Sequence, residues 1–191
     1  MELRAERPED AGAVARLVGE AFGQQGARVS KLVGQLRATI PPASRLCLVA
    51  SDGGAIVGHV MFSRGFLDAT RSLVEVKVLS PLAVAGSHRR LGIGAELVAN
   101  GVKVLADRGV PAVFLEGDPR YYGRLGFEPA LPRGFGKPSN RIPDEAFQVL
   151  VTKTHEPWMT GALVYPEAFW LNDVVGRRAA AGIGASESHT G

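Results

Sequence analysis

A glycine-rich turn is the part of the sequence best suited to bind a ligand. The segment Arg89-Arg90-Leu91-Gly92-Ile93-Gly94 comes directly before a helical pattern of apolar residues. The first turn of a helix leaves about four backbone N–H groups without partners, and the helix dipole adds partial positive charge there. Gly92 and Gly94 carry no Cβ, so a ligand can approach the backbone closely. With Arg89 and Arg90 beside it, this turn predicts a site for an anion such as a pyrophosphate.

Two glycines separated by one residue are also found in tight turns that only connect a strand to a helix. The segment lacks the Lys-Ser/Thr pair of a P-loop and the third glycine of a dinucleotide-binding fingerprint. The turn alone therefore does not decide between a ligand site and a structural connection. The elements around it must decide.

Two amphipathic helices are predicted near the start of the chain. Pro8-Glu9-Asp10 suits a first helical turn, and the apolar residues that follow at helical spacing are Val14, Leu17, Val18, Ala21 and Phe22. A second helix ends before Pro41-Pro42 and has an apolar face made of Val29, Leu32, Val33 and Leu36. Both helices need a sheet on which to pack.

That sheet is predicted from three apolar runs. Residues 46–51 and 56–62 are separated by Asp52-Gly53-Gly54 and predict a hairpin. The third run, residues 73–84, contains Pro81, and proline cannot donate a ladder hydrogen bond. We expect this strand to bulge or splay at Pro81, which leaves backbone groups free for a ligand.

The later elements complete an α/β pattern around the glycine-rich turn. A helix follows the turn and runs to Gly109, and a short buried strand is predicted at 113–116. Further along, a short helix is predicted at 119–125, a strand beginning at Phe127, and strands at 147–152 and 162–165. We expect one domain over residues 1–170 and a C-terminal tail, partly disordered, over residues 171–191.

Composition sets the class of protein. A chain of 191 residues fits one domain, since a single core serves up to roughly 250 residues. Lys plus Arg number 22 and Asp plus Glu 19, so the net charge of +3 gives no argument for a nucleic-acid partner. Cys47 is the only cysteine, which excludes an intrachain disulfide. With no apolar run of membrane-spanning length, we expect a cytoplasmic protein without membrane contact.

The chain resembles the GNAT superfamily of N-acetyltransferases. Leu82-Ala83-Val84, a spacer and Arg89-x-x-Gly92-x-Gly94 are similar to that family's Arg/Gln-x-x-Gly-x-Gly/Ala signature. Residues 122–127, Tyr-Gly-Arg-Leu-Gly-Phe, resemble its tyrosine-x-x-x-glycine-phenylalanine element at the usual separation. The similarity spans roughly residues 1–130, and residues 117–123, Gly-Asp-Pro-Arg-Tyr-Tyr-Gly, resemble a branch of bacterial predicted N-acetyltransferases.

The resemblance implies a fold and a cosubstrate. The fold would be α/β (α+β), with a mixed, mostly antiparallel central sheet whose strands four and five splay apart, flanked by helices. Acetyl-CoA would be the acyl donor, with its pantetheine arm in the splay. The residues implied in binding it are Leu82, Ala83, Val84, Arg89, Arg90, Leu91, Gly92, Ile93, Gly94 and Ala95.

Catalytic candidates follow from the tasks of direct acetyl transfer. An unprotonated amine must attack the thioester, the oxyanion must be stabilised, and the thiolate must receive a proton. By resemblance, Tyr122 is the general acid and the backbone N–H of Val84 faces the oxyanion. Glu75, on the interrupted strand, and Glu116, at the end of the next strand, are two candidate bases. Glu75 is equally compatible with an ion pair to Lys77 on the same strand face.

The sequence departs from the commonest family pattern before Tyr122. The family's usual asparagine is absent there, and Gly117-Asp118-Pro119 shortens that helix instead. His59, in an apolar strand, suits a buried core position better than a ligand role. With no cluster of histidines and acids at ligand spacing, the sequence predicts no metal site.

The leading hypothesis is an N-acetyltransferase that passes an acetyl group from acetyl-CoA to a primary amine in a ternary complex. The acceptor amine is not identified by the sequence. A CoA-binding regulatory or interaction module without transfer chemistry is the alternative, and nucleic-acid binding through Arg89-Arg90 and Arg177-Arg178 is a weaker one. No sequence feature fixes the oligomeric state, and a homodimer is compatible with it.

Overall fold

The computed structural model describes residues 1–176 and 178. In this part of the chain, nine strands form one sheet in the order β1-β2-β3-β4-β5-β8-β6, with β9 pairing to β3 and β7 to β9. Most pairs are antiparallel, whereas β4 with β5 and β7 with β9 are parallel. The strands are β1 (Glu2–Ala5), β2 (Leu46–Asp52), β3 (Ala55–Ala69), β4 (Leu73–Val84), β5 (Ala112–Glu116), β6 (Glu128–Pro129), β7 (Phe135–Gly136), β8 (Phe147–Val151) and β9 (Gly161–Val164).

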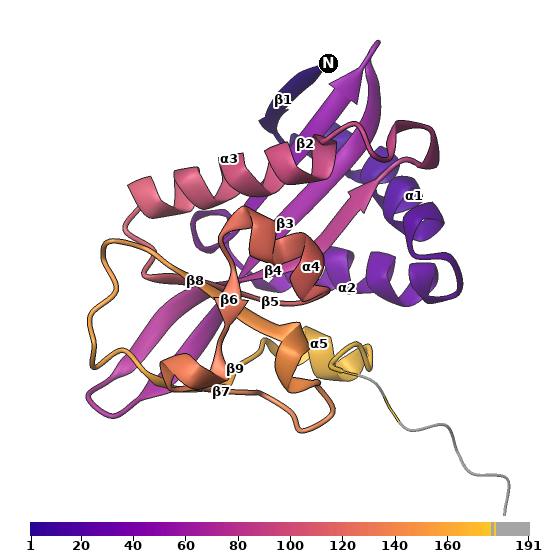
Figure 1. Cartoon of the computed structure of the whole chain (residues 1–191). Coiled ribbons are helices and arrows are strands. Elements are labelled where there is room, and N and C mark those ends of the chain that lie inside the picture. Colours follow the sequence, from indigo (N-terminus) through magenta and orange to yellow (C-terminus); the bar gives the residue numbers. More distant parts are fainter. Residues whose placement is uncertain (177, 179–191) are drawn as a thin grey trace, which may run out of the picture.

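Helices cover both faces of this sheet (Figure 1). They are α1 (Ala11–Ala21), α2 (Gly26–Thr39), α3 (Ile93–Asp107), α4 (Pro119–Tyr122) and α5 (Glu167–Leu171). Helix α3 packs on one face, where its buried residues Ile93, Leu97 and Leu105 join one core cluster. Helices α1, α2 and α5 lie on the other face and belong to two further clusters. The expected α/β fold with a mixed, mostly antiparallel sheet is therefore confirmed.

The predicted helices and hairpin are present, and the differences lie where local patterns are weak. Strand β1 was not predicted, because its sequence Glu2-Leu3-Arg4-Ala5 has no apolar run. Strand β3 continues to Ala69, seven residues beyond the predicted end at Phe62. Its first part pairs with β2, and its last four residues pair with β9. This long strand connects the first half of the sheet to its C-terminal part.

Strand β4 is interrupted as predicted. In its ladder with β3, Val60 pairs with Leu82 and Phe62 with Leu79, so Ser80 and Pro81 together face one residue of β3. This is a bulge on the β4 side. On its other edge β4 pairs with β5 only through Lys77 with Val113 and Val78 with Phe114. Beyond these two pairs the strands part, and the expected splay of strands four and five is confirmed.

Packing continues beyond residue 170, the boundary expected for the domain. Val175 is fully buried, and the Gly176 N–H donates a hydrogen bond to the Glu116 carboxylate at 3.0 Å. Residues 171–176 are therefore part of the folded domain, while the remainder of the expected tail, residues 177 and 179–191, lies outside the described residues. Across the described chain, every helix is too short or too polar to cross a bilayer.

Helix α3 is held close to the sheet by a glycine. A Cβ added at Gly101 would lie 2.2 Å from the ring of Phe62, a fully buried residue of β3. The helix and the strand could not come so near each other with any larger residue. Gly34, by contrast, is exposed on α2 with no atom within 4 Å of an added Cβ.

We predict opposite effects of the same substitution at these two glycines. Gly101→Ala should lower the free energy of unfolding by about 2 kcal/mol, because the core must shift to admit the methyl group. Gly34→Ala should raise it by about 0.5–1 kcal/mol through helix propensity. Urea unfolding followed by circular dichroism measures both. An unchanged midpoint for Gly101→Ala would contradict the close packing of α3 on Phe62.

Candidate active site

The unpaired edge of β4 exposes backbone groups of alternate residues. The Ala85 N–H donates to the Val57 carbonyl at 2.8 Å, so Ala85 faces β3. Backbone groups alternate sides along a strand, and Ala83 therefore also faces β3, opposite His59. Leu82 and Val84 direct their N–H and C=O groups toward the side from which β5 has parted. Of the three predicted contact residues on this strand, these two are the ones with backbone groups free for a ligand.

The glycine-rich turn has the geometry of an anion site. Gly92 precedes the first helical residue with φ of 83° and ψ of −7°, and Arg90 also has a positive φ of 66°. This sharp turn directs the N–H groups at the start of α3 outward. No side chain caps them. They therefore remain available to an anion, with the positive end of the helix dipole behind them.

A pocket of about 230 Å³ lies at this turn. Residues 88–90 and 92–95 line it together with Val84 and Tyr121. Arg89 is anchored there, because its guanidinium donates to the Ala21 carbonyl at the end of α1 at 3.4 Å. The exposed Leu91 is the one residue of the predicted run 89–95 that does not line this pocket. This pocket is called the turn pocket below.

Tyr121 was not predicted as a site residue. A Cβ at Gly94 would lie 2.7 Å from its hydroxyl oxygen, so the hydroxyl is held against the start of α3. Burial raises the pKa of this hydroxyl, which keeps its proton at neutral pH and can donate a hydrogen bond. The position of Tyr121 directly before Tyr122 could have indicated a role in the site, but only Tyr122 matched the tyrosine-x-x-x-glycine-phenylalanine element.

A second pocket, of about 250 Å³, lies at the bulge of β4. It is called the bulge pocket below. Residues 78–82 form one wall, and Phe22, Val29 and Leu32 close it from the side of α1 and α2. Phe169 and Val174, near the end of the described chain, also line it. Leu82 lines the bulge pocket and Val84 the turn pocket, so the free edge of β4 connects the two.

Tyr122 lines the bulge pocket. Its ring makes edge contacts with Tyr121 and Phe127, at centroid distances of 4.9 Å and 5.9 Å, which fix its orientation. Burial, with a smaller contribution from Tyr121, raises the pKa of its hydroxyl well above the ordinary value of 10.0. The hydroxyl is therefore protonated at neutral pH and has the form that a general acid requires.

Glu116 is the one carboxylate among the described residues that line the bulge pocket. The Tyr165 hydroxyl donates to its Oε1 at 3.0 Å and the Gly176 N–H to its Oε2 at 3.0 Å. Burial raises its pKa above the ordinary 4.5, although these two donors and the charge of Arg141 oppose the rise. A carboxylate with a raised pKa in a pocket has the properties of a general base.

Glu75 lies elsewhere. Its carboxylate forms an ion pair with the Lys77 ammonium group, and it lines neither the turn pocket nor the bulge pocket. It is five residues from Ser80 along an extended strand, a separation of roughly 16 Å. Of the two candidate bases predicted from the sequence, only Glu116 lines the same pocket as Tyr122.

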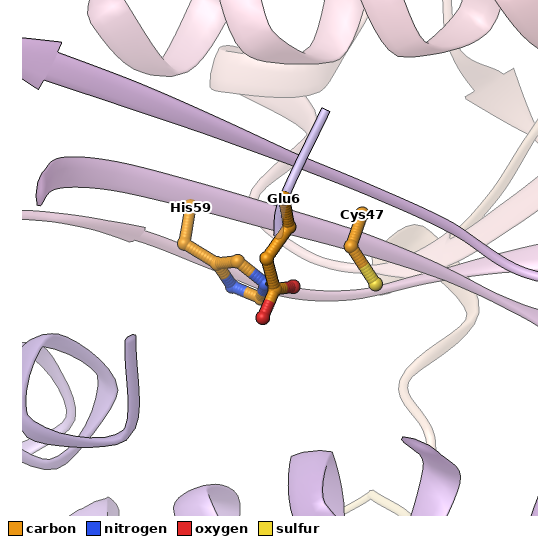
Figure 2. Close-up of side chains that lie close together, drawn as sticks. All are labelled: Glu6, Cys47 and His59. Carbon is orange, nitrogen blue, oxygen red and sulfur yellow. The ribbon is translucent and has the colours of Figure 1, made fainter. Parts of the chain in front are cut away.

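A separate polar cluster lies on the face of the sheet that α1 and α2 cover. Glu6 directly follows β1, whereas Cys47 lies in β2 and His59 in β3. Figure 2 shows their side chains pointing to the same side of the strands. One donor atom from each residue lies within 4.8 Å of the others. Sequence spacing did not indicate this cluster, because the three residues belong to separate segments.

The charges around this cluster suit a buried ion network rather than a cation site. Glu6 Oε1 contacts the Arg37 guanidinium, and Glu6 Oε2 lies 3.3 Å from the His59 Nε2 atom. Burial raises the pKa of the Cys47 thiol to about 12, with the charge of Glu6 adding to the rise. Burial also lowers the pKa of His59, which is fully enclosed. A neutral imidazole, a protonated thiol and an arginine beside the carboxylate leave little negative charge for a metal ion.

Known proteins resemble this chain over most of its length. Residues 16–127 match the model of the acetyltransferase (GNAT) family. The uncharacterized N-acetyltransferase YjhQ of Escherichia coli K12 is 32% identical over 137 residues, which are 71% of this chain and 74% of the relative. The uncharacterized N-acetyltransferase YhbS of the same strain is 35% identical over 129 residues, 67% of this chain and 74% of the relative.

Solved structures show the same fold. The crystal structure of Escherichia coli YhbS in complex with CoA has a TM-score of 0.76 at 31% identity, covering 88% of this chain and 91% of that one. A GNAT family acetyltransferase from Brucella melitensis in complex with acetyl-CoA has a TM-score of 0.69 at 28% identity, covering 88% and 97%. With its signature turn, parted strands and these relatives, the chain belongs to the GNAT family of acetyltransferases.

Proposed function

We propose that the protein transfers an acetyl group from acetyl-CoA to a primary amine, by direct attack of the amine in a ternary complex. The observation that carries the proposal is the free edge of β4, which connects an anion pocket at one end to an apolar pocket with a tyrosine and a carboxylate at the other. The CoA and acetyl-CoA complexes of YhbS and of the Brucella protein support the choice of donor.

The donor would lie along this edge. Its pyrophosphate accepts hydrogen bonds from the N–H groups at the start of α3, and Arg89 and Arg90 add positive charge. Its pantetheine arm pairs with the backbone of Leu82 and Val84 as an added strand would. The Leu82 N–H, in the bulge pocket, is then better placed for the thioester oxyanion than that of Val84, which lines the turn pocket.

Transfer needs three proton movements. Glu116 takes a proton from the acceptor ammonium, so that the amine lone pair can attack the thioester carbon and form the C–N bond. The carbonyl double bond then forms again as the C–S bond breaks, and Tyr122 donates its proton to the departing thiolate. The nitrogen loses its second proton to solvent, and Tyr122 regains a proton from solvent. The products are the N-acetylated amine and CoA.

The phosphate site can be tested with two glycines at opposite ends of α3. Gly92 and Gly109 have φ of 83° and 77°, and neither has an atom within 4 Å of an added Cβ. Glutamate at either position therefore meets similar backbone strain, but only at Gly92 does it place a carboxylate in the turn pocket. We expect Gly92→Glu to weaken CoA binding at least tenfold, or about 1.4 kcal/mol, and Gly109→Glu to leave it within twofold. Isothermal titration calorimetry measures the affinity of each variant for CoA. Equal affinities for both variants would contradict a phosphate site in the turn pocket.

The base can be tested with the two predicted carboxylates. Glu116 acts only when deprotonated, so activity should fall as the pH drops through its pKa, which lies above 4.5. Glu116→Gln should lower kcat by about a hundredfold and remove this acidic limb. Glu75→Gln should leave both kcat and the acidic limb of the pH profile unchanged. Thiol release measured from pH 5 to 9 gives the profiles, and a retained limb in Glu116→Gln would assign the base to another group.

The acid can be tested with the neighbouring tyrosines. Tyr122→Phe should lower kcat by about a hundredfold and leave the KM for acetyl-CoA nearly unchanged, because it removes a proton donor and no binding contact. Tyr121→Phe should raise that KM and leave kcat nearly unchanged, because its hydroxyl lies in the turn pocket. The reverse pattern in steady-state kinetics would assign the acid to Tyr121 and the binding contact to Tyr122. A fully active Tyr122→Phe variant would exclude Tyr122 as the acid.

A further inference from the structure

The side chains that line the bulge pocket are mostly apolar and include only one charged group among the described residues. Its thirteen lining residues include nine apolar side chains, two tyrosines, one serine and one carboxylate, Glu116. None of these described lining residues is Lys, Arg or His. Arg141, whose charge acts on Glu116, is itself paired with Asp173 at 3.2 Å. The pocket therefore offers one negative partner and no positive one.

This distribution restricts the charge of the acceptor. One ammonium group can pair with Glu116 and recover part of the cost of leaving water. A second ammonium group would enter an apolar environment without a partner, which disfavours polyamines and other polycations. A carboxylate on the acceptor would meet Glu116 and no cation, which disfavours free amino acids. The acceptor should carry one positive charge on an otherwise uncharged body.

The volume and the walls restrict its shape. The pocket has a volume of about 250 Å³, and the acetyl group takes part of it. Phe22 and Phe169, from opposite ends of the chain, line the pocket together with Val29, Leu32 and Val174. Such walls gain most by burying an apolar group of the size of a phenyl ring or a short alkyl chain.

We infer that the acceptor is a small primary monoamine with an apolar body, of the arylalkylamine or alkylamine class, whose ammonium group pairs with Glu116. This inference rests on the proposed acetyl transfer and adds the class of the acceptor. A longer acyl chain on the donor is another occupant that the apolar walls would accept. The Glu116 carboxylate favours an amine over an acyl chain as the occupant of the pocket, because an acyl chain makes no ion pair with Glu116.

Matched amines test the inference on the full chain with saturating acetyl-CoA. 2-Phenylethylamine and phenylalanine differ by one carboxylate, and hexylamine and 1,6-diaminohexane differ by one ammonium group. We expect kcat/KM, from thiol release, to be at least tenfold higher for the monoamine in each pair. A preference for phenylalanine, for the diamine or for a lysine-containing peptide would overturn the acceptor class while acetyl transfer itself stands. Faster turnover with hexanoyl-CoA than with acetyl-CoA would also overturn it, since the apolar walls of the bulge pocket would then bind the acyl chain of the donor and not the body of the amine.

A designed change of charge makes the test specific to the pocket. Val174→Asp adds a second carboxylate to the lining, and we expect it to raise the ratio of kcat/KM for 1,6-diaminohexane over hexylamine at least fivefold. Val164→Asp, on the exposed face of β9 outside the lining, is the control and should leave the ratio unchanged. An equal shift in both variants, or none in Val174→Asp, would contradict the assignment. Calorimetric binding of acetyl-CoA without thiol release from any amine would instead refute the proposed transfer, and the acceptor class with it.

Discussion

The parting of β4 from β5 is the feature on which the rest of the site depends. The two strands pair at only two positions, so the later half of β4 has an unpaired edge in the middle of the sheet. Backbone N–H and C=O groups without partners are costly away from water. A ligand with amide groups along an extended arm can satisfy them as another strand would. The interruption at Ser80 and Pro81 therefore opens the sheet and also selects the shape of what can enter.

The opening requires rigid supports on both faces. On one face, Gly101 lets α3 approach Phe62, and Gly58 lets the start of the same helix approach β3, since a Cβ there would lie 2.9 Å from Ile93 and Leu97. On the other face, Glu6 connects the Arg37 side chain of α2 to His59 of β3. The first half of the sheet is thus fixed between two layers, and the position of the turn at Gly92 is fixed with it.

The structural features of the proposed donor end could be predicted from the sequence because their signals are local. The bulge at Pro81, the turn at Gly92 and the first turn of α3 all fall within residues 79–95, and each acts through its own backbone. The proposed acceptor end could not be predicted in the same way. Glu116 receives its hydrogen bonds from residues 49 and 60 positions later in the chain, Tyr165 and Gly176. No periodicity within a short window contains that information, which is why Glu75 and Glu116 could not be ranked from sequence.

The extension of β3 explains how this distant segment reaches the pocket. Residues 66–69, beyond the predicted end of the strand, pair with β9, and Tyr165 follows β9 directly. Helix α5 then brings Phe169 to the wall, and the chain returns through Val174 to Gly176 at Glu116. The edge proposed for the donor is thus formed by one continuous segment, whereas the pocket proposed for the acceptor is closed by a late segment whose position depends on a long-range pairing. We therefore expect substitutions in that late segment to change which amine fits without disturbing the backbone proposed to hold the donor.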